Sequence, residues 1–370
     1  MKILFISRAY PPILGGIENQ NFGIGKALSE IATTRTIANK SGKKNLPFFL
    51  PWVALKVLFI LPGHEVVLLG DGVLSPLAVF WKMFHRKKKY ISIVHGLDIT
   101  FAHKKSILGR IYRAVNIPAL KKLDRLIMVG QETIAEAQKL GIPEEKCKFI
   151  PNGFDADEII AKKTKEDLER LLGMNLSGKK VIFRGGRFTK HKGVEWFIRN
   201  VMPKLPENCL FVAAGGGIAK KTAGDENYFP KCEKAVQDLG LENRVKLMLN
   251  LPRPQIKILF NACDLYISPN IKVPGSLEGF GITAIEAAAC GRVVLAADLE
   301  GLKDAIKNEQ NGFLLESGKA DMWADKIKDI LADDDFRNDF GKKASQFTIE
   351  NYSWNKIAKK YLEVIENTFS

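Results

Sequence analysis

The segment Glu278–Glu286, with the sequence EGFGITAIE, places two glutamates eight positions apart around a Gly-Phe-Gly turn. Glycines 279 and 281 allow positive φ and let a ligand approach the main-chain N–H groups. The apolar run from Thr283 to Cys290 predicts a helix whose free N–H groups and positive dipole end face this turn. Two carboxylates beside an anion-binding helix end suit a sugar joined to a phosphate. The alternative is a loop-to-helix junction with an acidic cap.

A second glycine-rich loop, Gly185-Gly186-Arg187-Phe-Thr-Lys190-His-Lys192-Gly193, follows an expected strand at 180–183. Arg187 can bind a diphosphate through two parallel hydrogen bonds, and Lys192 adds a mobile positive charge. Together they could neutralise a departing phosphate without a metal ion. An exposed basic loop without a ligand is the alternative, but its occurrence together with the two glutamates favours a site.

Two loops in the first half of the chain add candidate residues. Gly15-Gly16 lies between an expected strand and an expected helix, where backbone N–H groups could admit a phosphate. His95 ends an expected strand and could hydrogen-bond a sugar hydroxyl or assist proton movement; a structural histidine is the alternative. The chain contains neither GxGxxG nor GxxxxGK[ST], so dinucleotide and P-loop chemistry are not indicated.

Strand-like and helix-like runs alternate twice along the 370 residues, which predicts an α/β protein with two successive doubly wound domains. Turn residues at Pro151-Asn152-Gly153 mark the seam between them. Ligands of such sheets bind beyond the carboxyl ends of the strands. The expected strands are Lys2–Ile6, Glu65–Leu69, Tyr90–Val94, Arg125–Val129 and Cys147–Ile150, then Lys180–Phe183, Cys209–Ala213, Arg244–Leu249, Leu265–Ser268 and Val293–Ala296.

The composition is that of a globular enzyme, with 46% hydrophobic and 26% charged residues. The five cysteines form no CxxC pair, which favours reduced thiols in a cytosolic compartment over a disulfide framework or a zinc site. The opening MKILFI is read as a strand rather than as a signal peptide.

Positive charge is concentrated in the first half of the chain. Residues 1–150 carry 23 Lys and Arg against 10 Asp and Glu, or +13 of the total of +15, and residues 151–370 carry 33 against 31. This asymmetry suggests an anionic partner: a membrane surface, a phosphorylated acceptor or a nucleic acid. A solvated lysine-rich surface is the alternative. No nucleic-acid-reading motif is present, so a nucleic-acid partner is not expected.

One apolar segment, Leu46–Leu61 (LPFFLPWVALKVLFIL), bears on the membrane alternative. Its length and interruptions predict that it does not span a bilayer, and its prolines predict a helix only from about residue 50 onward. Trp52 and Lys56, with Lys43-Lys44 upstream, resemble an interfacial anchor. A core helix of the first domain is the alternative.

Taken together, these motifs resemble those of the GT-B glycosyltransferases, specifically the large retaining family 4. The resemblance covers nearly the whole chain. Its specific parts are Glu278 and Glu286 within EGFGITAIEAAACG, and Gly186-Arg187-x4-Lys192-Gly193. Supporting parts are Tyr10-Pro-Pro with Gly15-Gly16, His95-Gly96, Pro151-Asn152-Gly153 and Asn311-Gly-Phe313.

The resemblance implies roles for the donor-side residues. Arg187 and Lys192 would hold the diphosphate of the donor, in the loop that begins at Gly186. Glu286 would accept hydrogen bonds from the ribose hydroxyls, and Glu278 would contact the donor sugar. The Gly279, Phe280 and Gly281 N–H groups would face the donor.

The resemblance also implies a GT-B domain arrangement. Residues 1–155 would form the acceptor-side domain and residues 156–350 the donor-binding domain. Residues 351–370 would form a helix that packs back on the first domain. Gly16 would approach the diphosphate from the first domain, and His95 would lie near the transferred sugar.

The implied activity is transfer of a hexose, with retention of configuration, from a nucleotide sugar such as a UDP- or GDP-hexose. The acceptor would be a glycan or a membrane-linked lipid, and no metal or other cofactor would be needed. The location would be cytoplasmic, with peripheral contact between the basic first half and the inner face of the membrane. A GT-B sugar-nucleotide epimerase and a non-catalytic nucleotide-sugar-binding protein are the alternatives.

Overall fold

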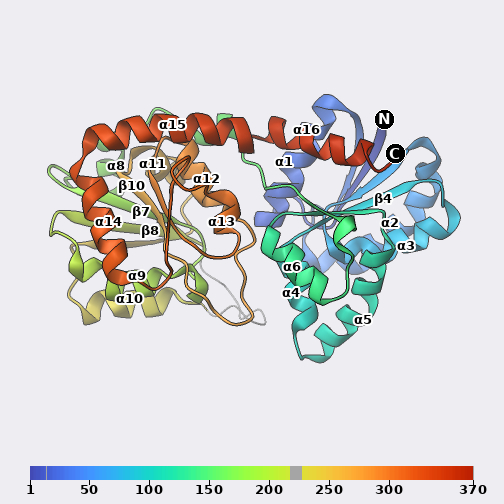
Figure 1. The fold of residues 1–370 in the computed structure, drawn as a ribbon, viewed down its shortest axis with the longest axis horizontal. Coiled ribbons are helices and arrows are strands. Elements are labelled where there is room, and N and C mark those ends of the chain that lie inside the picture. The colour runs from blue at the N-terminus through green and yellow to red at the C-terminus, as the bar shows by residue number, and fades with distance from the viewer. Residues whose placement is uncertain (14, 217–226, 370) are drawn as a thin grey trace. The chain divides into compact units, whose positions relative to one another are not determined.

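Figure 1 shows the computed structural model of the chain, which describes residues 1–13, 15–216 and 227–369. The chain divides into two compact units, Met1–Phe154 with Tyr352–Ser370 and Asp155–Asn351. Each unit contains one six-stranded parallel sheet with crossover helices. The predicted fold class, two doubly wound α/β domains, is therefore confirmed.

The sheet of the first unit has the strand order β2-β1-β3-β4-β5-β6. Most strands are continuous apolar runs, because helices cover both faces of a parallel sheet. The chain winds to one side of β1 and then to the other, so the order reverses between β1 and β3. The strands are β1 (Lys2–Ser7), β2 (Thr33–Ala38), β3 (Val66–Leu69), β4 (Lys89–Val94), β5 (Arg125–Met128) and β6 (Cys147–Phe149).

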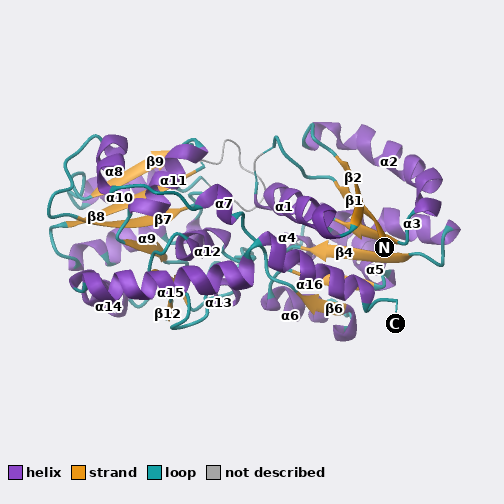
Figure 2. Cartoon of the chain, turned by 90° about the horizontal axis from the view of Figure 1, so that it is seen from above, coloured by secondary structure: helices purple, strands orange, loops and turns teal. Residues whose placement is uncertain are grey.

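Two helical layers cover this sheet, as Figure 2 shows from above. One buried cluster joins the sheet to α2 (Leu46–Ile60), α3 (Ser75–Phe84), α5 (Ile107–Lys122) and α6 (Gln131–Lys139). The cluster on the other face joins it to α1 (Gly16–Ile31) and to the C-terminal helix α16 (Trp354–Glu366). A Cβ atom on Gly23 of α1 would lie 2.1 Å from Trp354, so this glycine permits the close approach of α16.

The structure corrects two expectations in the first unit. Strand β2 was not predicted, because Thr33–Ala38 is a polar edge strand with only one buried residue. Helix α2 begins at Leu46 rather than near residue 50, since a proline in the first turn leaves no hydrogen bond unmade, and Pro51 is accommodated within it.

Flanking turns lengthen this helix at both ends. With η1 (Lys43–Asn45) and η2 (Leu61–Gly63), the helical run covers the 21 residues Lys43–Gly63 at a mean hydropathy of 1.8. By length and composition it is long and apolar enough to cross a membrane. The prediction that the segment is too short was therefore wrong.

The second sheet has the order β12-β11-β10-β7-β8-β9, which reverses between β7 and β10. Strand β12 was not among the expected strands. The strands are β7 (Lys180–Gly185), β8 (Cys209–Gly215), β9 (Val245–Leu249), β10 (Leu265–Ser268), β11 (Val294–Ala297) and β12 (Phe313–Leu315). The helices are α7 (Ala156–Ile159), α8 (Lys165–Leu172), α9 (Val194–Asn200), α10 (Phe229–Asp238), α11 (Arg253–Ala262), α12 (Ile282–Ala289), α13 (Leu302–Ala305), α14 (Ala320–Ala332) and α15 (Asp334–Tyr352).

Candidate functional site

The strongest candidate site lies in the second unit, at the carboxyl ends of β7 and β10. These two strands flank the point at which the strand order reverses, where ligands of open α/β sheets bind. The loop after β7 carries Arg187 and Lys192, and the loop after β10 carries Glu278 and leads into α12. The topology therefore brings together two motifs that lie about 90 residues apart in the sequence.

Glycine 193 allows these two loops to touch. Its φ is +70°, and a Cβ atom at this position would lie 1.8 Å from the Pro269 carbonyl oxygen. A backbone oxygen cannot move aside as a flexible side chain does, so a larger residue would push the loops apart. Gly281, at φ +90° before the first turn of α12, turns the second loop into the helix.

Lys192 and Glu278 form an ion pair, with their side chains only 15% and 12% exposed. The Asn270 amide also donates to Glu278 Oε2 at 3.0 Å. Burial tends to raise the pKa of Glu278, but the Lys192 ammonium and the Asn270 amide outweigh it and lower the pKa to about 2. Glu278 is therefore an ionised hydrogen-bond acceptor at neutral pH and not a general acid.

Two arginines add positive charge beside this pair. Burial lowers the pKa of the Lys192 ammonium, and the nearby Arg184 and Arg187 lower it further, while Glu278 opposes the shift. Arg187 is exposed. Arg184 is buried in β7, where Nη1 donates to the Gly186 carbonyl oxygen at 2.7 Å and Nε has no hydrogen-bond partner among the described residues. The loop therefore presents more positive charge than its carboxylate neutralises.

Glu286 lies in the second turn of α12, buried, and pairs with Arg253 at the start of α11. Arg253 Nη2 donates to Glu286 Oε1 at 2.6 Å, and Arg253 Nε donates to Glu158 Oε1 at 2.8 Å. Burial raises the pKa of Glu286, and the Arg253 guanidinium opposes this rise. Among the described residues, the hydrogen bond to Glu286 engages Oε1 and not Oε2.

The glycine-rich loop after β8 lies beside the same basic loop. The Asn250 N–H donates to the Gly215 carbonyl oxygen at 2.9 Å, and a Cβ atom on Gly216 would lie 4.0 Å from Arg187. Gly217, which ends the run of glycines, falls outside the described residues. Asn250 and Arg187 therefore both lie next to the glycine-rich loop, and Arg253, which pairs with Glu286, follows Asn250 by three residues.

The candidate residues of the first unit also lie at the carboxyl edge of their sheet. Gly15 precedes α1, which begins at Gly16, and no side chain caps the helix. A Cβ atom on Gly16 would meet nothing within 4 Å, whereas one on Gly15 would lie 2.1 Å from Glu18 Oε2, so a carboxylate lies beside this helix end. His95 follows β4, is buried, and has Nε2 3.1 Å from the Gly70 carbonyl oxygen. Since a carbonyl only accepts, Nε2 carries a proton, and the His95 side chain also accepts from the Asp98 N–H as the cap of the short helix α4 (Gly96–Thr100).

A buried polar network at this edge was missed by the sequence reasoning. Arg8 Nε donates to Asp71 Oδ1 at 2.9 Å across the β1–β3 switch point. Asp98 Oδ2 accepts from the N–H groups of His95 and Gly72, at 2.9 and 3.1 Å. Burial raises the pKa of Asp71, and the Arg8 guanidinium opposes the rise. The network holds the main chain around His95 in place.

Other residues missed by the sequence reasoning are Arg184, Asn270, Arg253 and Glu300, whose Oε2 accepts from the Glu278 N–H at 2.6 Å. The position of Arg184 next to the glycine pair was a usable signal, because a charged residue inside an otherwise apolar strand needs a reason. Arg253 and Glu300 gave no such signal, since their partners are distant in sequence. His191, in the same basic loop, is buried with Nδ1 2.9 Å from the Ser276 hydroxyl.

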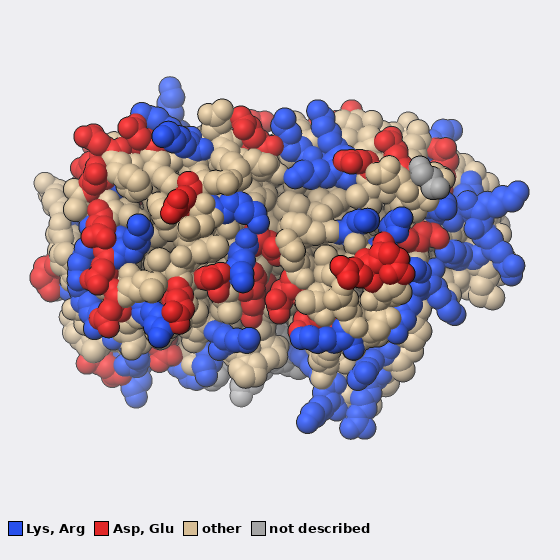
Figure 3. Space-filling model, in the orientation of Figure 1, with Lys and Arg blue, Asp and Glu red and all other residues tan. Residues whose placement is uncertain are grey.

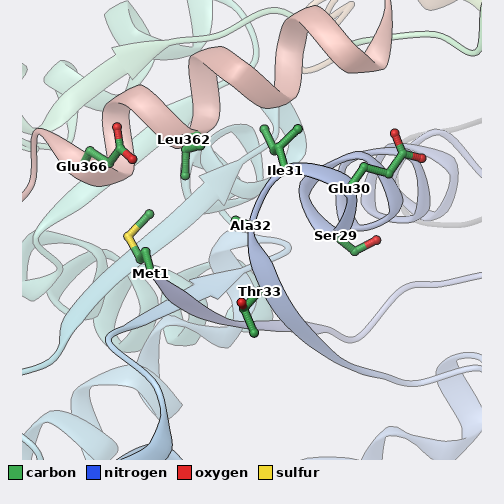
Figure 4. Close-up of a pocket in the computed structure, with 8 residues that line it drawn as sticks. All are labelled: Met1, Ser29, Glu30, Ile31, Ala32, Thr33, Leu362 and Glu366. Atoms are coloured by element: carbon green, nitrogen blue, oxygen red, sulfur yellow. The ribbon is translucent and has the colours of Figure 1, made fainter.

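A pocket of about 460 Å³ opens elsewhere, at the amino-terminal edge of the first sheet (Figure 4). It is lined by Met1, by the end of α1 and by α16, and its charged side chains are Glu30 and Glu366. An acidic lining does not suit a diphosphate. Among the described residues, no three His, Cys, Asp or Glu side chains are grouped so that they could hold a metal ion.

Two family models match this chain. Residues 174–347 match the glycosyl transferases group 1, and residues 26–158 match glycosyltransferase family 4. The two matches fall on the two units. The first range contains the basic loop, both glutamates and the Gly-Phe-Gly turn before α12, and the second contains His95. The chain therefore belongs to the group 1 glycosyltransferases, and the family recognised from its motifs is confirmed.

Similar proteins have been named in several organisms. An uncharacterized glycosyltransferase of Methanocaldococcus jannaschii is 31% identical over 60% of this chain and 54% of its own length. A D-inositol 3-phosphate glycosyltransferase of Corynebacterium aurimucosum is 30% identical over 66% of this chain and 57% of its own. The matches thus span little more than half the length of these relatives. An N,N'-diacetylbacillosaminyl-diphospho-undecaprenol alpha-1,3-N-acetylgalactosaminyltransferase of Campylobacter jejuni is 27% identical over 74% of this chain and 69% of its own.

Solved structures share the whole fold. Anabaena HepE in complex with UDP is 21% identical, with a TM-score of 0.77 over 99% of this chain and 100% of that one. The sucrose-phosphate synthase of Thermosynechococcus elongatus is 21% identical, with a TM-score of 0.76 over 100% of this chain and 99% of that one. These similarities support the GT-B fold for this chain.

Proposed function

We propose that this protein transfers a hexose from a nucleoside-diphosphate sugar to an acceptor hydroxyl, with retention of the anomeric configuration and without a metal ion. The observation that carries the proposal is the convergence of Lys192, Arg184, Arg187 and Glu278 at the switch point of the second sheet. Family membership supports the reaction class.

In the proposed complex, the donor diphosphate lies against the basic loop. Arg187, which is exposed, provides a planar guanidinium that can bind two phosphate oxygens at once. The Lys192 ammonium has three N–H donors, and its ion pair with Glu278 leaves others for phosphate oxygens. The first N–H groups of α12, together with those of residues 279–281, add neutral donors and the positive end of a helix dipole.

The glutamates bind the two sugars of the donor. Glu278, which stays ionised because its pKa is about 2, accepts hydrogen bonds from hydroxyl groups of the transferred hexose. Glu286 accepts from the ribose hydroxyls through the oxygen that Arg253 leaves unused. The segment 250–253 lies next to Glu286 and forms the side on which we place the base. The structure of Anabaena HepE is a complex with UDP, so uridine donors are the first to test.

Charge stabilisation is the main catalytic contribution that these residues can make. As the bond between the anomeric carbon and the phosphate oxygen breaks, negative charge develops on the diphosphate, and fixed cations stabilise it more than they stabilise the intact donor. In the proposed front-face reaction, the acceptor oxygen bonds to the anomeric carbon on the side that the phosphate leaves. The acceptor proton passes to the departing phosphate oxygen, so no protein base is required.

The first unit would supply the acceptor side. Gly16 begins α1 and His95 follows β4, both at the carboxyl edge of the sheet in this unit. The C. jejuni relative is named for a diphospho-undecaprenol-linked acceptor. With the +13 charge of residues 1–150, this favours a membrane-linked glycan or lipid acceptor, met at the cytoplasmic face of the membrane.

Donor binding is the first test. A thermal-shift screen of UDP-, GDP- and ADP-sugars should raise the melting temperature for one nucleotide class, because a ligand that binds only the folded state stabilises it. Lys192→Met should abolish the shift. Lys190→Met is the matched control, since Lys190 is an exposed residue of the same loop.

Transfer is then measured with EDTA present, using the donor identified by that screen and lipid-linked acceptors. We expect the wild type and Lys190→Met to be active, and Lys192→Met and Glu286→Gln to lose activity by at least about a hundredfold. Full activity in both of the latter variants would overturn the assignment of the site. An epimerised nucleotide sugar formed without any acceptor would instead identify an epimerase.

A further inference from the structure

Helix α2 exposes a continuous apolar stripe to solvent. Phe48, Trp52, Leu55 and Phe59 are 76%, 48%, 61% and 82% exposed. Their spacing of four, three and four residues places them on one side of the helix, along about 16 Å of its axis. Lys56 is the only charged residue between Leu46 and Ile60. The solvent side of a helix in a soluble domain is ordinarily polar, so this stripe implies that something covers it.

The opposite side of α2 packs into the core of the first unit. Phe49, Val53 and Val57 are buried in the core cluster under the sheet. Residues of α3 and of the turn after it also contact the α2 backbone. Trp81 Nε1 donates to the Ala54 carbonyl oxygen at 2.8 Å, and His85 Nε2 lies 3.2 Å from the Leu58 carbonyl oxygen. A helix tied to the domain along its length lies flat on the surface, so this segment does not cross a bilayer although it is long enough.

The same apolar character continues on the neighbouring helices. Met83 and Phe84, at the end of α3, are exposed. On α5, the exposed residues Ile107, Leu108, Ile111 and Val115 form a second stripe. Helices α2, α3 and α5 pack side by side on one face of the sheet, as Figures 1 and 2 both show. The exposed apolar residues therefore belong to one helical layer.

Basic residues surround the α2 stripe. Lys43 and Lys44 precede α2, and Lys88 Nζ donates to the Pro62 carbonyl oxygen at 3.2 Å, which holds the run 86–88 near the C-terminal end of α2. Lys56 Nζ lies 4.2 Å from the centre of the Trp52 ring. In Figure 3, Lys and Arg side chains gather over this end of the first unit and over α5.

Negative charge is nearly absent from the same region. Residues 31–123 contain 16 Lys and Arg but only three acidic residues, and two of these, Asp71 and Asp98, are buried. A second copy of this chain would bring like charges together, which disfavours a symmetric dimer through this face. An anionic lipid surface offers both a hydrocarbon layer for the stripe and negative headgroups for its basic surroundings.

We propose that α2 is an in-plane membrane helix, which inserts Phe48, Trp52, Leu55 and Phe59 among the lipids of an anionic bilayer while Lys43, Lys44 and the run 86–88 contact headgroups. The α3 and α5 residues extend the contact. This inference goes beyond the proposed sugar transfer, because it concerns a surface and would stand for any reaction catalysed by the chain.

Vesicle cosedimentation of the full chain, without donor or acceptor, tests the proposal. Vesicles contain phosphatidylcholine with or without about 30% phosphatidylglycerol. We expect binding to the anionic vesicles, weakened at least tenfold by 0.5 M salt, which is about the fold-change expected when several headgroup contacts are screened. Phe48→Ser/Phe59→Ser should weaken binding by about a hundredfold, since each large apolar side chain contributes about tenfold. Leu239→Ser/Met322→Ser, at exposed apolar positions of the second unit, is the matched control and should bind as the wild type does.

Tryptophan fluorescence gives a second readout at the stripe itself. Trp52 is the most exposed of the five tryptophans, and Trp81 and Trp323 are buried. Lipids brominated in their acyl chains should quench the wild type, and Trp52→Phe should lose most of this quenching while it still binds. The other tryptophans then serve as an internal reference.

Three results would overturn the proposal. In the first, the folded wild-type protein does not bind anionic vesicles at low salt. In the second, Phe48→Ser/Phe59→Ser binds these vesicles as well as the wild type does. In the third, the wild type forms a stable dimer and the same double substitution dissociates it. Circular dichroism of each variant shows whether it folds. A failure of sugar transfer leaves these outcomes unaffected, so the two proposals are tested separately.

Discussion

Replacing Lys192 with methionine tests the physical basis of the candidate site. The substitution keeps most of the apolar stem and removes the ammonium, so Glu278 keeps only the Asn270 amide and the pKa of Glu278 rises because burial is no longer opposed. Both partners are at least 85% covered, so their pairing is not a surface ion pair. We therefore expect a measurable loss of stability in the second unit.

The magnitude follows from the same pair. The pKa of Glu278 falls from 4.5 to about 2, which corresponds to about 3 kcal/mol at neutral pH. Removing one partner of a buried ion pair costs about 3–5 kcal/mol in general. Burial of Lys192 offsets part of this, because it lowers the pKa of the ammonium. We expect Lys192→Met to lower the free energy of unfolding by about 2–3 kcal/mol at pH 7.

The pH dependence has a definite sign. A carboxylate whose pKa is depressed in the folded state stabilises the fold above its unfolded pKa, here about 4.5, and this stabilisation is lost as the pH falls towards 2. The difference between wild type and Lys192→Met should therefore be largest at pH 7 and shrink as the pH falls through the raised pKa of Glu278 in the variant and on towards 2.

Urea unfolding at pH 7, 4 and 3 measures this difference. Trp196 and Trp323, whose rings lie 6.2 Å apart, report on the second unit. Lys190→Met is the control and should be neutral. Lys192→Met/Glu278→Gln should recover at least half of the loss, since no uncompensated carboxylate remains. An equal loss at pH 7 and pH 3, or a double variant no more stable than the single one, would refute this reasoning.

Three further predictions concern other parts of the chain. Gly193→Ala should lower the melting temperature and abolish donor binding, because the new Cβ would lie 1.8 Å from the Pro269 carbonyl oxygen. Gly178→Ala is the control: Gly178 has a similar φ but open space around it, so calorimetry should show only a slight loss of stability. Arg253→Met should weaken nucleotide binding by about ten- to a hundredfold, measured by titration calorimetry. The substitution leaves Glu286 buried without its cation and further raises the pKa of that carboxyl. Unchanged affinity would show that Glu286 is not part of the site. Gly23→Val should destabilise the first unit by roughly 2 kcal/mol or more, because the larger side chain displaces Trp354 and with it α16. Hydrogen exchange of the amides in α16 measures this effect, and unchanged protection would contradict the packing of α1 against α16.

The sequence was sufficient to predict the fold class and the motifs of the candidate site. Buried parallel strands are continuous apolar runs, so β1, β3, β4, β7, β8 and β10 were recognisable from composition and length. Strand β2 was not, because an edge strand with polar residues has no such pattern. The prolines at 47 and 51 led to a predicted helix start near residue 50, but α2 begins at Leu46, since a proline in the first turn of a helix breaks no hydrogen bond.

The partners of the motif residues could not be predicted. Nothing in the local sequence relates Lys192 to Glu278, Glu286 to Arg253, or Arg8 to Asp71, because each pair is separated by 33 residues or more. Their proximity depends on the order in which the strands pair, which brings the carboxyl ends of non-consecutive strands to one edge. The same contacts decide which carboxylate is ionised and which is shifted towards neutrality.

The sequence alone determined that this chain is an α/β protein with glycine-rich turns, paired glutamates and a strongly basic first half, because these are properties of residue type and spacing. Only the tertiary structure decided that Glu278 is neutralised by Lys192 and that Phe48 and Phe59 point away from the domain while Phe49 and Val53 point into it. Burial and distance arise when segments far apart in the chain pack together, so no local pattern contains them.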